Sequence, residues 1–264
     1  MALELQSVGG TMGIALKELV ACLDEELQPQ LFKDYCPNGL QVEGKDSVGK
    51  IITGVTACQA LIDKAIELNA DALLVHHGYF WKGDDAVLTG MGRRRIESLL
   101  KNGISLIAYH LPLDGHPELG NNAQLAKRMG WSVKGGMGSG QARPVGNWGE
   151  PDQVMSVGDM ASRLEQSLSR KPLVISGGSH DVKTLAWCTG AAQNMIKNAV
   201  ELGVDAFVSG EISESTVHFA RENGIHYFSA GHHATERYGV QALAVFLEKK
   251  CGIEHEFIDI DSPV

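Results

Sequence analysis

Cysteine is scarce in this sequence, and its spacing excludes two common kinds of site. The five cysteines lie far apart, are odd in number and form no Cys-x-x-Cys pair. A disulfide framework is typically built from an even, dense set of cysteines, and thiolate zinc sites typically use Cys-x-x-Cys pairs. We therefore interpret these residues as buried or incidental thiols, and any metal ligands must be sought among other side chains.

Long apolar runs are also lacking. No segment approaches the roughly 20 apolar residues of a membrane-spanning helix. The N-terminal residues show no basic leader followed by an apolar stretch, so we expect neither a membrane span nor a signal peptide, and a cytoplasmic location. With 44% hydrophobic and 21% charged residues, the 264-residue chain is typical of a soluble globular protein of one large or two ordinary domains.

Positive charge is in short supply. The 23 Lys and Arg residues face 32 Asp and Glu residues, which gives a formal net charge of −9. Proteins that coat nucleic acid are usually basic, so this balance disfavours general nucleic-acid binding but leaves room for a local positive pocket. The one compact basic run, Arg93-Arg94-Arg95, is more simply a solvated helix face than a phosphate contact.

A phosphate-binding loop is missing as well. Glycines cluster in Lys134–Gly140, but neither Gly-x-x-x-x-Gly-Lys-Ser/Thr nor a well-placed Gly-x-Gly-x-x-Gly occurs there. We interpret the cluster as a flexible surface connection within a linking segment, residues 131–183. Ser156 and Asp159 form a capping-box pattern that predicts a helix through Leu168.

The sequence does contain an internal repeat. Gln59–Ala72 aligns without gaps with Gln193–Ala206, and seven of the fourteen positions are identical. In each copy, a strand-like run precedes an apolar pattern at helical spacing, and a second short apolar run follows. Each copy therefore predicts a strand–helix–strand crossover, with the functional loop after the second strand.

The similarity continues downstream of each crossover. Gly103–His110 and Gly224–His232 are both apolar strands that end in a histidine, and a carboxylate, Asp114 or Glu236, follows four residues later. We interpret the chain as a pseudo-duplicated α/β protein whose two similar halves face one another. The first domain is expected over residues 1–130, and the second, with the linking segment, over 131–264.

The first candidate metal ligands are two adjacent histidines. His76 and His77 directly follow a predicted buried strand, and Gly78 opens a turn after them. Neighbouring side chains on a regular strand point to opposite faces, so the pair does not easily share one ion. At a strand end they can point towards two ions a few ångströms apart. Taken alone, the pair is more simply one structural and one exposed histidine.

Asp114 is the first candidate carboxylate. It lies between Pro112 and Pro117, which fix the backbone, and Asn121 and Asn122 are expected to cap the following helix. Without other candidates nearby, Asp114 would be an ordinary turn residue.

His232 and Glu236 begin a predicted helix after the last strand of the second copy. Residues four apart share one helical face, so both can reach the same ion; an ordinary surface ion pair is the alternative. We choose Glu236 as the carboxylate that bridges two ions.

All of these segments lie at the carboxyl ends of predicted parallel strands, where α/β folds place their sites. Histidine and carboxylate ligands without a thiolate favour zinc, iron, manganese, cobalt or nickel over magnesium and calcium. We therefore predict one site that holds two divalent metal ions per chain, with the ligands His76, His77, Asp114, His232 and Glu236.

Four segments in combination resemble one known family, from about residue 14 to the C-terminus. Pro37–Glu43, Val75–Trp81, His110–Asp114 and Gly231–Glu236 are similar to signature segments of the Nif-three-like family, described as GTP cyclohydrolase I type 2 homologues or dinuclear metal-binding proteins. The resemblance implies two similar α/β domains, a dinuclear site in the cleft between them and a toroidal homohexamer. It also carries the ligand roles onto the same five residues. Where the family often has Gly-Asp, this chain has Gly-Glu211, so Glu211 is expected beside the site.

Two dications beside Asp114 and Glu236 would leave a locally positive pocket that attracts anions and activates a bound water. The first hypothesis is therefore a metal-dependent hydrolase for a small nucleotide-like or phosphorylated substrate, similar to GTP cyclohydrolase type 2, with His110 or Glu211 moving protons. The second is a non-enzymatic ring that binds metal or ligand, or assists DNA repair. A redox site with iron is a third interpretation, for which the sequence names no co-substrate.

Overall fold

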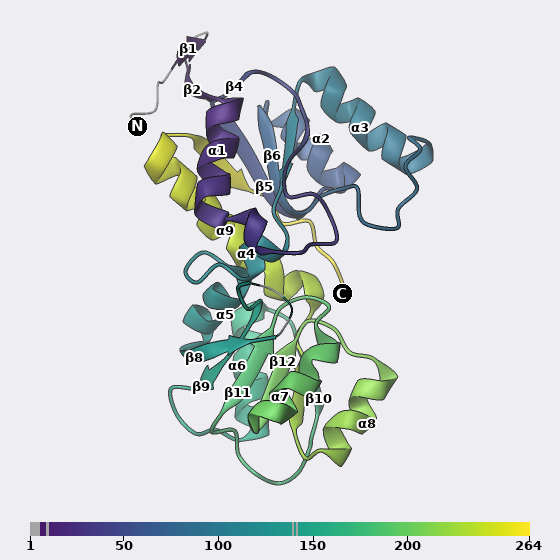
Figure 1. The fold of residues 1–264 in the computed structure, drawn as a ribbon, viewed down its shortest axis with the longest axis vertical. Coiled ribbons are helices and arrows are strands. Elements are labelled where there is room, and N and C mark those ends of the chain that lie inside the picture. Colours follow the sequence, from purple (N-terminus) through teal and green to yellow (C-terminus); the bar gives the residue numbers. More distant parts are fainter. Residues whose placement is uncertain (1–5, 9–10, 139, 141) are drawn as a thin grey trace. The chain divides into compact units, whose positions relative to one another are not determined.

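The computed structural model describes residues 6–8, 11–138, 140 and 142–264, and there the chain is a mixed α/β protein (Figure 1). Two compact units are present. Unit 1 comprises Met1–Leu113 and Val240–Ile260, and unit 2 comprises Asp114–Gly239 and Asp261–Val264. Relative to the expected halves 1–130 and 131–264, residues 114–130 belong to unit 2 and Val240–Ile260 belongs to unit 1. Among the described residues, no helix is long and apolar enough to cross a membrane.

Unit 1 is built on a five-stranded sheet in the order β14-β5-β6-β7-β3. The first four strands run parallel and β3 is antiparallel at the edge. The strands are β3 Gly39–Val42, β5 Lys50–Thr56, β6 Ala72–His77, β7 Ser105–Ala108 and β14 Glu254–Phe257. A small second sheet contains β1 Gln6–Val8, β2 Thr11–Ala15 and β4 Ser47–Val48.

Helices cover both faces of the five-stranded sheet (Figure 1). Its helices are α1 Leu16–Leu27, η1 Pro29–Leu31, α2 Gln59–Glu67, α3 Gly90–Asn102, α4 Leu111–Asp114 at the boundary with unit 2, and the end of α9 His232–Cys251. Helices α2 and α3 pack on one face of the sheet, where they share an apolar core with it. Helices α1 and α9 lie on the opposite face of the sheet. Burial on both faces explains why β6 is apolar from Ala72 to Val75. The predicted crossover β5–α2–β6 is confirmed.

Unit 2 has a six-stranded sheet in the order β10-β13-β12-β11-β9-β8. The three strands β11, β12 and β13 are parallel, and the other three pair antiparallel. The strands are β8 Ser132–Met137, β9 Gly146–Glu150, β10 Leu173–Ile175, β11 Leu185–Cys188, β12 Ala206–Ser209 and β13 His226–Ser229. The helices are α5 Asn121–Met129, α6 Val157–Leu168, η2 Gln193–Met195, α7 Ile196–Leu202, α8 Glu214–Glu222 and the start of α9.

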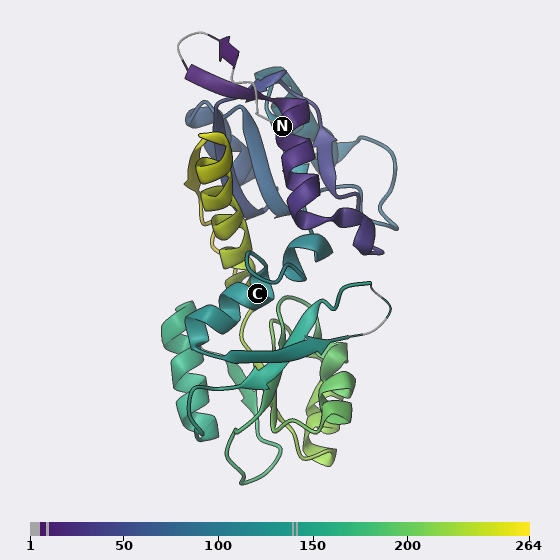
Figure 2. The same ribbon diagram turned by 60° about the vertical axis from the view of Figure 1, so that its left-hand side comes forward.

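Figure 2 shows this sheet between two helical layers, the teal α5 and α6 on one face and the green α7 and α8 on the other. Two separate apolar cores, one on each face, account for the arrangement. The crossover from β11 through α7 to β12 is parallel, as predicted. The predicted helix from Ser156 to Leu168 is also confirmed, and the Ser156 hydroxyl accepts the Asp159 N–H at 3.1 Å.

The prediction that the glycine cluster is a loop is wrong for its first part. Lys134 to Met137 lie in β8, paired antiparallel with β9. Gly138 and Gly140 lie outside the strand, and Ser139 lies outside the described residues. A Cβ on Gly135 would stand 2.6 Å from Trp148 Nε1, so glycine here allows close approach of the partner strand's indole. The cysteine interpretation is confirmed: all five are free, four are buried, and Cys58 is partly buried.

The parallel strands of the two units pair in the same register. Ala72 of β6 pairs with Ser105 of β7, and Ala206 of β12 pairs with His226 of β13. Counting forward from these pairs, His110 corresponds to Gly231, so His232 lies one residue further along than the sequence pattern suggested.

An aspartate just before the second strand of each crossover ties that strand to the first. Asp71 Oδ2 accepts the backbone N–H groups of Gly49 and Lys50 at 3.0 and 3.1 Å. In unit 2, Asp205 Oδ2 accepts those of Lys183 and Thr184 at 2.9 and 2.8 Å. The aspartate that is identical in the two copies of the repeat therefore has the same structural role in both units: it joins the starts of two neighbouring strands.

Replacing Asp205 with asparagine should cost about 1–3 kcal/mol of stability at neutral pH. Burial alone raises the pKa of Asp205, but hydrogen bonds from Thr184 and Lys183 outweigh it and lower the pKa below 3.8. The unfolded state therefore binds the proton first, so this stability is present above pH 3.8 and lost as the pH falls through the folded pKa. Urea unfolding with chelator at several pH values should show the difference between wild type and variant shrinking in acid; a constant difference would contradict it.

Candidate metal centre

Three histidines of unit 1 lie together at the carboxyl ends of β6 and β7. His76 and His77 are the last residues of β6, and His110 follows β7 by two residues. One ring nitrogen from each lies within 4.8 Å of the others. The ring centroids of His76 and His77 are 4.6 Å apart, and His76 is fully buried. The strand end thus brings the two adjacent histidines to one place, as the sequence pattern required.

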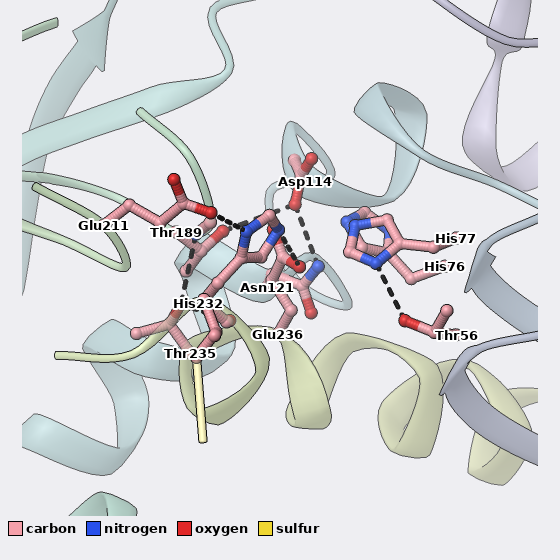
Figure 3. A network of polar contacts seen from close by, with 12 residues as sticks. Thr56, His76, His77, Asp114, Asn121, Thr189, Glu211, His232, Thr235 and Glu236 are labelled. Carbon is pink, nitrogen blue, oxygen red and sulfur yellow. Dashed lines mark hydrogen bonds and ion pairs between the residues drawn. The ribbon is translucent and has the colours of Figure 1, made fainter. Parts of the chain in front are cut away.

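Hydrogen bonding decides which nitrogen of His76 carries the proton. Its Nδ1 lies 2.9 Å from the carbonyl oxygen of Tyr109, which can only accept. Nδ1 therefore carries the proton, and Nε2 keeps its lone pair in the neutral ring. His77 Nδ1 contacts the Thr56 hydroxyl at 3.1 Å (Figure 3). Both rings are held through Nδ1, which is the usual arrangement when Nε2 binds a metal ion.

Unit 2 holds two buried carboxylates close together. Asp114, at the end of α4, is 5% exposed, and Glu236, in the first turns of α9, is 2% exposed. An oxygen of each lies within 4.8 Å of the other. Two ionised carboxylates at this distance inside a protein repel each other, and a cation bound by both removes the repulsion. The donor chemistry therefore fits a divalent ion.

His232 lies between two carboxylates of unit 2. Its Nε2 is 3.0 Å from Glu236 Oε2, and its Nδ1 is 2.7 Å from Glu211 Oε1 (Figure 3). Burial alone lowers the pKa of His232, but Glu236 and then Glu211 outweigh it and raise the pKa to about 9. A metal ion at Nε2 must therefore displace a proton. Glu211 lies beside the candidate ligand and orients it, as expected from the sequence.

Asp114 is positioned by two neighbours. Its Oδ1 accepts from Asn121 Nδ2 at 2.8 Å and from the Thr189 hydroxyl at 3.3 Å. Asn121 Oδ1 accepts the N–H of Gly239 at 2.9 Å, and a Cβ on Gly239 would stand 2.4 Å from that oxygen. The asparagine cap predicted for α5 is wrong, because Gly120 is the N-cap residue and no side chain caps it. The amide of Asn121 holds the carboxylate instead.

Gly190 follows β11 and makes room for the carboxylate and the histidine of α9. A Cβ there would stand 2.0 Å from Glu236 Oε1 and 3.1 Å from His232 Nε2. Its φ of +69° also favours glycine. The position matches Thr56 in the repeat, and Thr56 contacts His77 in unit 1. Gly190 was not predicted from the sequence, although its position directly after a predicted parallel strand indicates a functional loop.

Cys36 is a poor ligand at neutral pH. Burial, followed by the charge of Asp34, raises the pKa of its thiol to about 12. The groups suited to a metal ion are therefore imidazoles in unit 1, and one imidazole with two carboxylates in unit 2. The fold and these groups define a class: an α/β protein with buried histidine, aspartate and glutamate side chains that could bind a metal ion.

The chain belongs to the Duf34/NIF3 (NGG1p interacting factor 3) family, whose sequence profile matches residues 14–263. The GTP cyclohydrolase 1 type 2 homolog of Vibrio cholerae is 56% identical over 249 residues, 94% of this chain and 98% of that protein. The homolog of the same description from Pseudomonas aeruginosa is 52% identical over 252 residues, 96% of this chain and 100% of that protein.

A solved structure has the same fold. The structure of protein ybgI, described as of unknown function, superposes with a TM-score of 0.92 at 50% identity, covering 95% of this chain and all 100% of that one. The family resemblance inferred from the four motifs is confirmed.

Proposed function

We propose that this protein binds two divalent metal ions and uses them to hydrolyse a small, nucleotide-like or phosphorylated substrate. The observation that carries the proposal is the pair of buried carboxylates, Asp114 and Glu236, beside His232 in unit 2. Such a like-charged pair is costly without a cation. The proposed ligands are the five residues predicted from the sequence: His76, His77, Asp114, His232 and Glu236.

In this proposal, residues of both units would hold the ions, and Glu236 would be the carboxylate that both ions use. The two units are then copies of one ancestral α/β unit with the metal site between them. Two observations support this duplication: seven identities in fourteen aligned positions, and three parallel strands in matching register in each unit.

When bound, the ions would polarise a substrate oxygen and lower the pKa of bound water. The chain's own part is positioning: Asn121 and Thr189 hold Asp114, and Glu211 holds His232. The proposed substrate class draws support from the relatives described as GTP cyclohydrolase 1 type 2 homologs.

The test is turnover of GTP and a panel of other nucleotides by protein reconstituted separately with zinc, iron, manganese, cobalt and nickel. Product should form with wild type and be lost with Asp114→Asn. Equal rates in the two proteins would reveal a contaminant. Two bound ions without turnover of any substrate would reject the hydrolase and leave a metal-binding protein.

Nucleic acid is not proposed as a partner. The basic run lies on α3, and Arg93 pairs with Glu97 at 3.4 Å, as expected for a solvated helix face. Assembly as a toroidal homohexamer, implied by the family, stays a prediction. Sedimentation equilibrium should then give six times the mass of one chain.

A further inference from the structure

We propose that His226 makes the contact between β13 and residues 176–181 of unit 2 sensitive to acid. The neutral ring of His226 holds these residues, here called the 176–181 segment, against the start of β13, and a proton on the ring releases them. His226 is the first residue of β13, whereas the candidate ligand His232 follows the other end of that strand. The inference therefore goes beyond the proposed metal chemistry and does not depend on it.

Both ring nitrogens of His226 are hydrogen-bonded to the backbone of the 176–181 segment. The Gly177 N–H donates to Nδ1 at 3.1 Å. Nε2 lies 2.9 Å from the carbonyl oxygen of His180, which can only accept. The proton of the neutral ring is therefore on Nε2, and Nδ1 keeps its lone pair. A second proton would go to Nδ1 and face the Gly177 N–H, so the charged ring cannot make both hydrogen bonds.

Close packing keeps solvent away from His226. The residue is fully buried. A Cβ on Gly177 would overlap the backbone of Ile225, so the segment lies directly against the chain that enters β13. A buried imidazolium whose Nδ1 faces another donor is costly, because its N–H has neither an acceptor nor water. The charged ring is accommodated when the segment moves away and water reaches it.

The ionisable groups that face His226 in the described part of the chain are His180 and Asp181 of the segment and Asp205, just before β12. The rings of His180 and His226 have centroids 4.1 Å apart and an interplanar angle of 32°. Burial, together with charge on His180, keeps the pKa of His226 below 6.5. The hydrogen bond to the His180 carbonyl and the charges of Asp205 and Asp181 oppose this shift of the pKa without reversing it. The closed segment therefore prefers the neutral ring.

Unit 1 has the same contact with a side chain that does not titrate. Ser105 is the first residue of β7 and occupies the position of His226 in the strand pairing of the two units. Its Oγ accepts the Gly44 N–H at 3.0 Å. Gly44 lies two residues after the end of β3, as Gly177 lies two residues after the end of β10, and each of these edge strands pairs antiparallel with the strand concerned. The two units thus share this contact, and unit 2 has a titratable group in it.

Acid should open the 176–181 segment. The pKa of an exposed histidine is about 6.5, so the ring takes up its proton more readily in the open segment than in the closed one. The stability of the closed segment is therefore complete above about pH 6.5 and decreases as the pH falls towards the lower pKa of the buried ring. One proton binds on opening, so the equilibrium constant for opening should rise roughly tenfold for each pH unit in that range.

The test is hydrogen exchange of the Gly177 amide, measured by NMR from about pH 8 to about pH 5 and corrected for the intrinsic exchange rate at each pH. Its protection should fall roughly tenfold for each pH unit below about 6.5. The Gly44 amide of the same sample, bound to Ser105, should change less than about twofold for each unit. His226→Ser places the unit 1 side chain in unit 2 and should abolish the pH dependence at Gly177. His218→Gln, which removes an exposed histidine of α8, is the matched control and should behave as wild type does.

Titration of the His226 ring by NMR is the second measurement. Wild type should show the Nε2–H tautomer at neutral pH and a midpoint below 6.5. His180→Gln keeps the backbone acceptor but removes the neighbouring imidazole, so the midpoint should move to higher pH. This variant carries the test if His226→Ser does not fold.

Three results would overturn the proposal: a Gly177 amide whose protection does not depend on pH, equal pH dependence in His226→Ser, or a wild-type midpoint at or above 6.5. The profile of Gly177 should be the same with and without a metal chelator. A pH dependence that is present in only one of these two conditions would assign the response to the metal centre and not to His226.

Discussion

Asp114→Asn should lose metal binding while the metal-free protein keeps, or gains, stability. An asparagine oxygen can still accept from Asn121 and Thr189, so the hydrogen bonds to Oδ1 survive. The repulsion between Asp114 and Glu236 disappears, which favours the metal-free fold. The affinity for the ion should fall roughly 100-fold or more, because loss of a ligand exceeds the 10–100-fold effect of an outer contact.

Unfolding with and without metal measures both effects. At a metal concentration about 100 times the dissociation constant of wild type, the free energy of unfolding of wild type should rise by roughly 2.7 kcal/mol. That of the variant should rise by less than about 0.5 kcal/mol. Glu165→Gln, on the exposed side of α6, removes a charge elsewhere in unit 2 and should gain as much as wild type. A destabilised metal-free variant with unchanged affinity would assign Asp114 a structural role only.

Gly190→Ala should damage stability and metal binding together. The methyl group would stand 2.0 Å from Glu236 Oε1, so the carboxylate or the backbone must move. The left-handed backbone adds its own cost for a residue with a Cβ. Together, crowding and backbone strain should cost roughly 2–4 kcal/mol.

Gly203→Ala separates those two causes. Gly203 has the same φ of +69°, but a Cβ there meets nothing within 4 Å. The free energy of unfolding of this control should fall by about 1–2 kcal/mol, and its metal affinity should equal that of wild type. Chemical unfolding and metal titration of both variants provide the comparison. Equal losses, with metal binding intact in both, would show that Glu236 is not held against Gly190.

The parallel cores could be predicted because they depend on short-range patterns. The spacing of apolar residues predicts a strand, a helix and a strand in each copy of the repeat, Gln59–Ala72 and Gln193–Ala206, together with the flanking residues. Other parts depend on long-range pairing that no local pattern encodes. The parallel pairing of β14 with β5 joins Glu254–Phe257 to a strand about 200 residues earlier in the chain. The pairing of β8 with β9 similarly overrides a glycine-rich composition that favours a loop.

The candidate ligands could be predicted from the sequence for the same reason. Histidine and carboxylate residues directly after apolar strands stand out in a sequence, and the structure places each at a strand or helix end within its unit. Their neighbours do not stand out. Asp34 and Asn121 act through contacts with His110 and Asp114, and nothing in their own flanking sequence distinguishes them from turn or capping residues.

The most direct test of the central claim is the number of metal ions per chain in gently purified protein, measured by elemental analysis with native mass spectrometry. The proposed site predicts two divalent ions per chain in wild type and fewer in Asp114→Asn. Wild type that carries no ion, and takes up none when zinc, iron, manganese, cobalt or nickel is supplied, would contradict it.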